Sequence, residues 1–274
     1  MSIKQGAVKI SELQSVKGKF SLAGKKAIVT GGAGGIGRST AAAMAELGAD
    51  VALVDIRLDK AQENADEIAK RFGTKVIAVK CDVTKPDEVN AMIETVVREL
   101  GGLDCVHSNA GIVANDDTVD MPFESWNRMV SVNFTGMFLV DQAAAVWMRE
   151  HGVKGAIVNT ASMSAHIINR CHFGDPHMIC YNATKGGVLN LTKGMAMGFA
   201  EAGIRFNSIS PGYMWSGIHD TMDDARLEAW ANDVPMGRFG SMNEIGGLVA
   251  FLVSDLAEYM TGADVLIDGG YCVW

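Results

Sequence analysis

Short apolar runs alternate with longer amphipathic stretches along this chain. Seven runs rich in β-branched and small apolar residues have the length of buried strands: residues 26–30, 50–54, 76–79, 105–108, 156–160, 205–208 and 265–267. Helical stretches lie between them at residues 38–47, 60–72, 86–100, 123–149 with an interruption, 182–200 and 242–252. This alternation predicts the α/β class, with a single doubly wound, mainly parallel sheet flanked by helices on both faces.

The length and composition favour one large domain. The chain has 274 residues, of which 48% are hydrophobic and 20% are charged, and it shows no internal repeat or low-complexity segment. We expect a catalytic domain over residues 22–274 and an N-terminal extension over residues 1–21. The extension contains no uninterrupted apolar stretch, so neither a secretory signal nor a membrane span is expected in it.

The charge and the cysteine and histidine positions indicate which partners, compartment and metal content to expect. A net charge of −8 and the lack of a long Lys/Arg run argue against nucleic acid and favour a small-molecule substrate. The five cysteines are an odd number without Cys-x-x-Cys spacing, which is typical of reduced thiols and predicts a cytoplasmic protein without disulfides. Three histidines at 166, 172 and 177 lack the helical spacing of a zinc pair, so no metal is expected.

A glycine cluster follows the first strand. In the segment Thr-Gly-Gly-Ala-Gly-Gly-Ile-Gly, residues 30–37, the glycines let backbone amides and a helix N-terminus approach a pyrophosphate. Asp55 ends the second strand 18 residues beyond Gly37, where a dinucleotide fold places the acid that binds the adenosine ribose hydroxyls. Its charge repels a 2′-phosphate, so NAD is favoured over NADP, although Arg38 and Arg57 lie nearby in sequence. The alternative is a tight turn without a ligand and an Asp55 that only caps a strand end.

Tyr181 and Lys185 stand four residues apart at the start of a predicted helix. Residues at i and i+4 share one helix face, so the Lys185 ammonium can approach the Tyr181 phenol and favour its phenolate form. A tyrosine so tuned can act as a general base toward an alcohol. On its own such a pair is common on helix surfaces, and the glycine cluster is what raises its significance.

Taken together, these motifs resemble the classical short-chain dehydrogenase/reductase family over about residues 22–270. Further matching residues are the Asn-Ala-Gly triplet at 109–111, Asn133 in Ser-Val-Asn-Phe, Ser162 after the fifth strand, and Pro211-Gly212. The interval from Ser162 to Tyr181 is longer than is typical of the family, and Ser164 is the competing serine. The resemblance implies a Rossmann domain, a homotetramer, and a carboxyl tail ending at Trp274 that reaches a neighbouring subunit.

The resemblance also implies roles for individual residues. Tyr181 takes the hydroxyl proton, Ser162 binds the substrate oxygen, Lys185 lowers the Tyr181 pKa, and Asn133 holds a water that links Lys185 to solvent. Asp82 is expected to contact the adenine, with a turn cap as its alternative role. The full set of cofactor contacts is Gly31, Gly35, Ile36, Gly37, Asp55, Asp82, Val83, Asn109, Ala110, Gly111, Tyr181, Lys185, Pro211 and Gly212.

Segments at residues 163–167, 210–214 and 268–271 are similar to those of family members that oxidise sugar alcohols. The preferred function is therefore NAD-dependent interconversion of a secondary alcohol of a polyol and the matching ketose. Two alternatives stay open: reduction of a 3-oxoacyl or other keto substrate, and a non-catalytic regulator that binds the dinucleotide without turnover. The complete set of Asn133, Ser162, Tyr181 and Lys185 argues against the regulator, since binding alone needs no phenolate.

Overall fold

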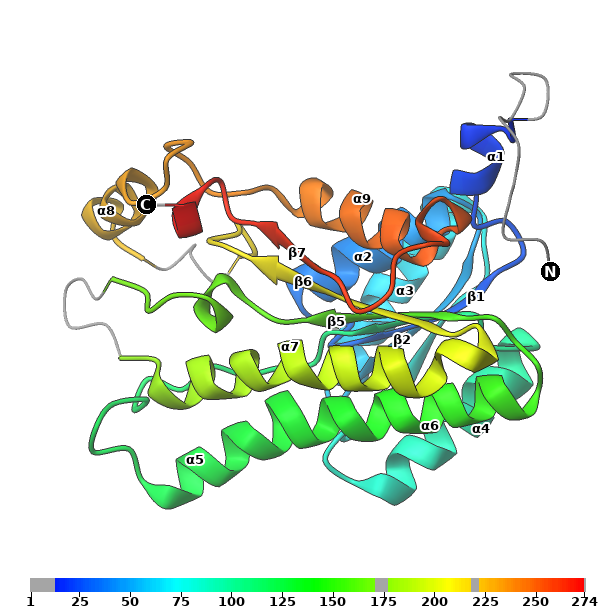
Figure 1. Cartoon of the computed structure of the whole chain (residues 1–274), viewed down its shortest axis with the longest axis horizontal. Helices are drawn as coiled ribbons and strands as arrows, with labels where there is room; N and C mark the ends of the chain where they lie inside the picture. Colours follow the sequence, from blue (N-terminus) through cyan, green and yellow to red (C-terminus); the bar gives the residue numbers. More distant parts are fainter. Residues whose placement is uncertain (1–12, 171–176, 218–221, 274) are drawn as a thin grey trace, which may run out of the picture.

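The computed structural model describes residues 13–170, 177–217 and 222–273. Seven parallel strands form one sheet in the order β3-β2-β1-β4-β5-β6-β7 (Figure 1). They are β1 (Lys26–Thr30), β2 (Asp50–Asp55), β3 (Val76–Lys80), β4 (Cys105–Ser108), β5 (Ala156–Thr160), β6 (Arg205–Pro211) and β7 (Asp264–Ile267). The predicted fold class is thereby confirmed: the chain order reverses between β1 and β4, as in doubly wound sheets, which bind ligands at that point.

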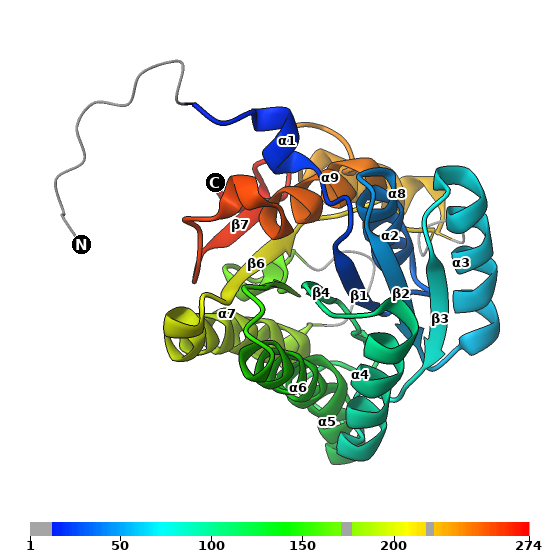
Figure 2. The same ribbon diagram turned by 90° about the vertical axis from the view of Figure 1, so that its right-hand side faces the viewer.

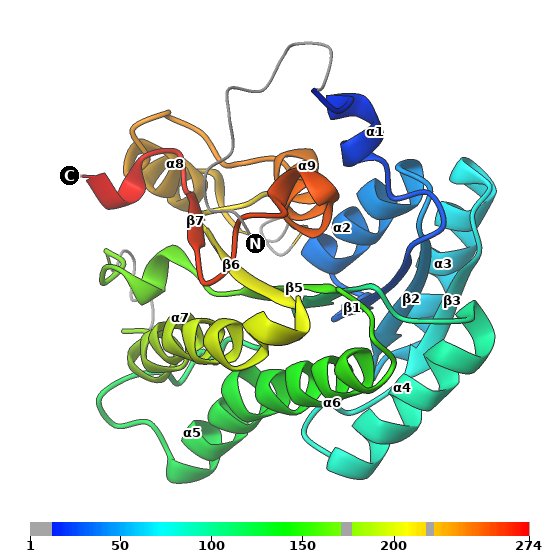
Figure 3. The same cartoon turned by 45° about the vertical axis from the view of Figure 1, so that its right-hand side comes forward.

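Helices cover both faces of the sheet (Figures 2 and 3). One layer contains α2 (Gly35–Glu46), α3 (Leu58–Phe72) and α9 (Met242–Val253), and its core includes Met44, Leu53 and Ile245. The other layer contains α4 (Pro86–Leu100), α5 (Phe123–Val130), α6 (Met137–Glu150) and α7 (Ile179–Phe199). Central strands are therefore buried from both sides, which explains their continuous apolar sequence.

Several boundaries differ from the sequence prediction. The helix predicted from residue 38 begins at Gly35, inside the glycine turn, and the helix predicted from residue 182 begins at Ile179. Two short helices, α1 (Val16–Phe20) and α8 (Asp224–Asn232), were not predicted. The extension expected over residues 1–21 contains α1, whereas residues 1–12 and the tail residue Trp274 lie outside the described residues.

The predicted interruption of the long helix is a change of helical pitch. Residues Ser131–Gly136 form one π-helical segment, η2, between α5 and α6, and the backbone stays helical through it. Among the described residues, the combined helix Phe123–Glu150 is long and apolar enough to cross a membrane. In its most apolar stretch 44% is buried inside the fold, and core helices of soluble proteins have the same length and hydropathy. Because π-helical turns concentrate at functional sites, η2 directs attention to its residues.

Candidate active site

The glycine turn between β1 and α2 is packed too closely for side chains. Gly31 has φ +68°, and a Cβ there would lie 2.9 Å from Asn109 Nδ2. A Cβ on Gly37 would meet the carbonyl oxygen of Gly31, and one on Gly35 would lie 2.7 Å from the carbonyl oxygen of Ser216. The turn thus presents bare backbone at the start of α2, which is the arrangement that a pyrophosphate requires.

Asp55 lies directly beside this turn. Its Oδ2 accepts a hydrogen bond from the Ala33 amide at 3.0 Å, and its Oδ1 accepts one from the Arg57 amide at 2.9 Å. The carboxylate is 8% exposed, and Arg57 Nε lies 3.5 Å from it. A carboxylate has further lone pairs, so these bonds leave acceptor capacity for ribose hydroxyls. The bare turn and the adjoining acid together fit a dinucleotide.

The end of β4 is bonded to the end of β1. Thr30 Oγ1 accepts hydrogen bonds from the Asn109 amide at 2.9 Å and the Ala110 amide at 3.0 Å, while Asn109 Nδ2 donates to the Thr30 carbonyl. Next to them, a Cβ on Gly111 would lie 3.4 Å from Asn133 Oδ1 and 3.7 Å from Lys185 Nζ. The Asn-Ala-Gly segment therefore lies between the glycine turn and the residues of α7.

The remaining predicted cofactor residues occupy varied environments. Asp82 Oδ1 accepts hydrogen bonds from the amide and the hydroxyl of Thr84, which is the turn-capping geometry that the sequence left open. Gly212, at the end of β6, is so close to β7 that a Cβ would lie 2.7 Å from Asp268 Cα. Val83 is buried, Pro211 closes β6, and the partly buried Ile36 side chain packs against the core that contains Met44, Leu53 and Ile245.

Tyr181, Ser162 and Lys185 come together where α7 passes the end of β5. The Tyr181 phenol and the Ser162 hydroxyl are hydrogen-bonded. Lys185 Nζ lies 5.6 Å from the centroid of the Tyr181 ring and donates to the Thr160 carbonyl at 2.7 Å. Ser162 lies two residues after the end of β5 and caps the short helix Met163–Ala165 by accepting a hydrogen bond from the Ser164 amide. The i, i+4 spacing thus places both α7 side chains at the carboxyl end of the sheet.

Burial dominates the titration of this pair. It raises the pKa of the Tyr181 phenol above its ordinary value, and the hydrogen bond with Ser162 offsets part of that rise. It lowers the pKa of Lys185 to about 8. The Lys185 ammonium bonds the Thr160 carbonyl in this arrangement, and the lowering of the Tyr181 pKa by Lys185 stays a prediction.

Asn133 sits on η2 and is fully buried. Its Oδ1 accepts the Ile112 amide at 2.8 Å and its Nδ2 donates to the Ile112 carbonyl at 2.9 Å. The wider π-helical turn sets this side chain against the segment that follows Gly111, so Asn133 fastens that segment to the helix. The water predicted beside Asn133 stays a prediction.

The competing serine has another partner. Ser164 Oγ donates to Asn169 Oδ1 at 2.6 Å, within the long loop between Ser162 and Tyr181. The loop is held to the C-terminal region, since the Arg170 amide donates to the Tyr271 hydroxyl and His166 Nε2 contacts Asp264 Oδ2 at 2.9 Å. The Ser164 hydroxyl is thus bonded within the loop, whereas the Ser162 hydroxyl is bonded with the Tyr181 phenol.

Sequence reasoning missed Thr160 and Ser216. Thr160 holds Lys185 through its carbonyl, a role of the backbone that carries no residue signature. Ser216 lies over the glycine turn, and its position five residues after Pro211 was the available signal. In the part of the chain that the structure describes, no group of three His, Cys, Asp or Glu side chains has the arrangement of a metal site, while His172 and Asp175 lie outside that part.

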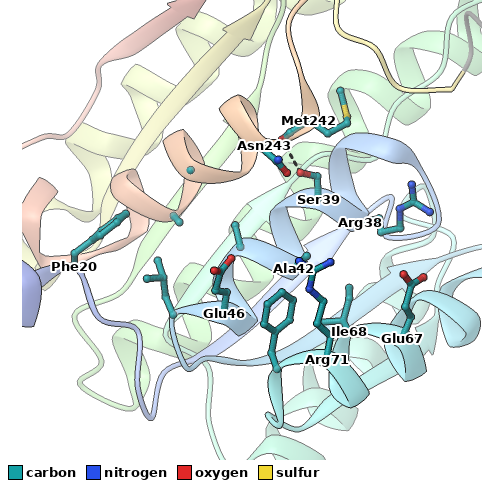
Figure 4. Close-up of a pocket in the computed structure, with 15 residues that line it drawn as sticks. Phe20, Arg38, Ser39, Ala42, Glu46, Glu67, Ile68, Arg71, Met242 and Asn243 are labelled. Carbon is teal, nitrogen blue, oxygen red and sulfur yellow. Dashed lines mark hydrogen bonds between the residues drawn. The ribbon is translucent and has the colours of Figure 1, made fainter.

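A cavity of about 790 Å³ lies elsewhere, between α2, α3 and α9 (Figure 4). Phe20, at the end of α1, closes one side, and Ser39 Oγ on α2 donates to the Met242 carbonyl across it. Arg38 and Arg71 line it together with Glu46 and Glu67. The cavity borders the helices behind the glycine turn and takes no lining residue from β5 or α7.

The fold and this arrangement define an oxidoreductase with a nicotinamide dinucleotide cofactor. A family model described as Enoyl-(Acyl carrier protein) reductase matches residues 31–272. The chain is 36% identical to an NADP-dependent mannitol dehydrogenase of Alternaria alternata over 97% of this chain and 99% of that protein. It is also 36% identical to sorbose reductase sou1 of Schizosaccharomyces pombe, over 92% of this chain and 98% of that protein. The chain belongs to the short-chain dehydrogenase/reductase family.

Solved structures agree with this assignment. A short-chain type dehydrogenase/reductase from Mycobacterium marinum shares 44% identity with a TM-score of 0.88, and the match covers 94% of this chain and 99% of that one. An NAD+-bound xylitol dehydrogenase shares 33% identity with a TM-score of 0.82, over 91% of this chain and 99% of that one. Within the family, the chain thus resembles the polyol dehydrogenases, as the sequence predicted.

Proposed function

We propose that this protein is an NAD-dependent dehydrogenase that interconverts a secondary alcohol of a polyol and the matching ketose. The observation that carries the proposal is the Tyr181 phenol bonded to Ser162 beside a buried Lys185. Similarity to mannitol dehydrogenase, sorbose reductase and xylitol dehydrogenase supports the substrate class.

In this proposal the protein's own side chains handle the proton. Ser162 hydrogen-bonds the substrate oxygen, and Tyr181 accepts the hydroxyl proton during oxidation and returns it during reduction. Bound NAD supplies the acceptor for the hydride that leaves the same carbon. Lys185 and Asn133 provide polar contacts beside the reacting groups, and Lys185 can also bind ribose hydroxyls. Gly31, Gly35, Gly37 and Asp55 would hold the dinucleotide.

Tyr181→Phe tests the mechanism. Removing the phenol oxygen should lower kcat for polyol oxidation by about 10²- to 10⁴-fold while NAD affinity is retained. The matched control is Tyr259→Phe, because Tyr259 is fully exposed and should tolerate the same change. Turnover is followed by absorbance of the reduced nicotinamide with a panel of polyols, ketoses, steroids and acyl ketones. Unchanged activity of the Tyr181→Phe enzyme would refute the mechanism.

The choice of NAD rests on Asp55. A 2′-phosphate would meet its carboxylate at the glycine turn, although relatives such as the Alternaria mannitol dehydrogenase are named NADP-dependent. Asp55→Asn should weaken NAD use and improve NADP use, changing the ratio of kcat/KM values by about tenfold or more. Asp59→Asn, an exposed aspartate on α3, controls for loss of charge alone. A wild-type preference for NADP would overturn this part of the proposal.

A second candidate is a 3-oxoacyl reductase. It is favoured by the description of the matching family model and by 36% identity to a 3-oxoacyl-[acyl-carrier-protein] reductase FabG of Staphylococcus aureus, over 90% of this chain and 97% of that protein. The net charge of −8 and Asp55 favour the polyol function over it. Turnover of an acyl ketone but of no ketose in the panel would select this candidate.

We further propose a cytoplasmic homotetramer. Phe123 is 70% exposed on α5 and Met197 is 85% exposed on α7, and the two helices pack on each other. Large exposed apolar side chains on neighbouring helices are typical of surfaces that other subunits cover. Light scattering coupled to gel filtration tests the state, and a monomeric mass at micromolar concentration would refute it.

A further inference from the structure

The helix that carries the reacting side chains has no capping group of its own. Met178, which precedes α7, has left-handed backbone angles (φ 58°, ψ 31°) and makes no side-chain capping bond. It is the one non-glycine residue with positive φ in the described part of the chain. The first amides of a helix have no partner within it, and a polar side chain at this position normally bonds them. At α7 the partner must therefore come from elsewhere.

Asp117 supplies that partner from a distant loop. Its Oδ1 accepts the Cys180 amide at 2.8 Å and its Oδ2 accepts the Tyr181 amide at 2.9 Å. Its backbone carbonyl also accepts the Met178 amide at 3.0 Å. The residue is fully buried, and it lies 64 positions before Tyr181. One carboxylate thus completes the start of α7 and bears a negative charge at the positive end of the helix.

The loop that contains Asp117 also touches the other parts of the site. It begins with the Asn-Ala-Gly segment bonded to Thr30, and Ile112 is bonded through both backbone groups to Asn133. It ends on the amide of Tyr181. We propose that Asp117 is a positioning residue for the reaction, fixing the Tyr181 phenol relative to Ser162 and the glycine turn. This proposal rests on the function proposed above.

The bonds of Asp117, rather than its charge, carry this role. The pKa of Tyr181 is set by burial and by the hydrogen bond with Ser162. For the neighbouring Cys180, by contrast, burial and then the charge of Asp117 raise the pKa to about 11. Loss of the carboxylate should therefore act on Tyr181 through displacement of the ring, which weakens its bond with Ser162.

Three variants test the proposal in the full-length enzyme. Asp117→Ala removes both acceptors and should lower kcat by about 100-fold, the scale expected for a displacement near 1 Å. Asp117→Asn keeps one acceptor and should lower kcat by about tenfold. Asp120→Asn, an exposed aspartate in the same loop, is the matched control and should leave kcat unchanged. The alcohol KM and the NAD dissociation constant should stay within about twofold of wild type for all three.

The pH profile separates positioning from simple stabilisation. Since the bond with Ser162 lowers the Tyr181 pKa, its loss should shift the rise of kcat for alcohol oxidation to higher pH in Asp117→Asn. Thermal unfolding gives the folded fraction of each variant, and if Asp117→Ala does not fold, Asp117→Asn decides. An unchanged kcat per folded molecule with an unchanged pH profile would reduce Asp117 to a stabilising cap and overturn the proposal.

Failure of the proposed function has a different signature. If the wild type ignores polyols but reduces another ketone of the panel, the polyol assignment fails and the Asp117 comparison is made with that ketone. If Tyr181→Phe keeps full activity, the mechanism and the Asp117 proposal fall together. An enzyme that binds NAD but turns over no compound of the panel would likewise refute both.

Discussion

A buried carboxylate beneath the site makes the pH dependence of stability predictable. Asp141, on α6, is fully buried, and its Oδ1 accepts the Ser108 hydroxyl at 2.6 Å. Its Oδ2 accepts Asn159 Nδ2 at 2.9 Å, and the same Nδ2 lies 3.0 Å from Thr192 Oγ1 on α7. The network joins two helices to β4 and β5, just before the strand ends that hold Asn109 and Lys185.

Burial raises the pKa of Asp141 from 3.8 to about 7, against the opposing effect of its two hydrogen bonds. Between these values the unfolded chain has lost the proton that the folded protein keeps, so this residue makes stability fall as the pH rises from about 4 to about 7. The difference is about three pKa units, and each is worth about 1.4 kcal/mol, so the loss is on the order of 4 kcal/mol at pH 8. Such a loss is a large fraction of a typical unfolding free energy.

Asp141→Asn isolates this contribution. Urea unfolding of both proteins is measured from pH 4.5 to 8 at one protein concentration, and the free energy of the wild type is subtracted from that of the variant. Mispairing of the new amide with Asn159 changes the difference in unfolding free energy by the same amount at every pH. Titration of Asp141 instead makes that difference depend on pH. Over this pH range the difference should rise by roughly 3 kcal/mol in favour of the variant. A flat or falling difference curve would show that Asp141 is ionised in the folded protein and would refute the reasoning.

Two further predictions concern the glycine turn and Lys185. Gly37→Ala places a Cβ on the Gly31 carbonyl and should weaken NAD binding by at least about tenfold in calorimetry, whereas Gly194→Ala, at an open helical position, should leave it unchanged. Lys185→Met should abolish polyol turnover. Because burial lowers the Lys185 pKa to about 8, the stability of the wild type relative to this variant should rise by roughly 3 kcal/mol between about pH 8 and 10.5, and urea unfolding that shows no such rise would contradict it.

The strands were predictable because strand formation and burial in the sheet favour the same apolar, β-branched residues. All seven were located within about three residues at each end. The central strands are buried on both faces and are therefore short and apolar, and the partly buried edge strands β3 and β7 are also short and rich in β-branched residues. Residue types near these strand ends also identified the glycine turn, Asp55 and Ser162. Composition could not reveal backbone partners such as the Thr160 carbonyl, which accepts a hydrogen bond from the Lys185 ammonium and so fixes its direction.

The start of α7 shows why local sequence patterns identify reactive side chains more readily than they predict where those side chains lie. The sequence predicts a start at residue 182, and the structure begins three residues earlier, where Asp117 bonds the Cys180 and Tyr181 amides from another loop. Tyr181 thereby becomes part of the first helical turn instead of preceding it. The motif specifies a phenol and an ammonium on one helix, while the placement of that helix depends on a contact across 64 residues. Substitutions in the loop of residues 109–117 are therefore expected to alter catalysis without touching the motif.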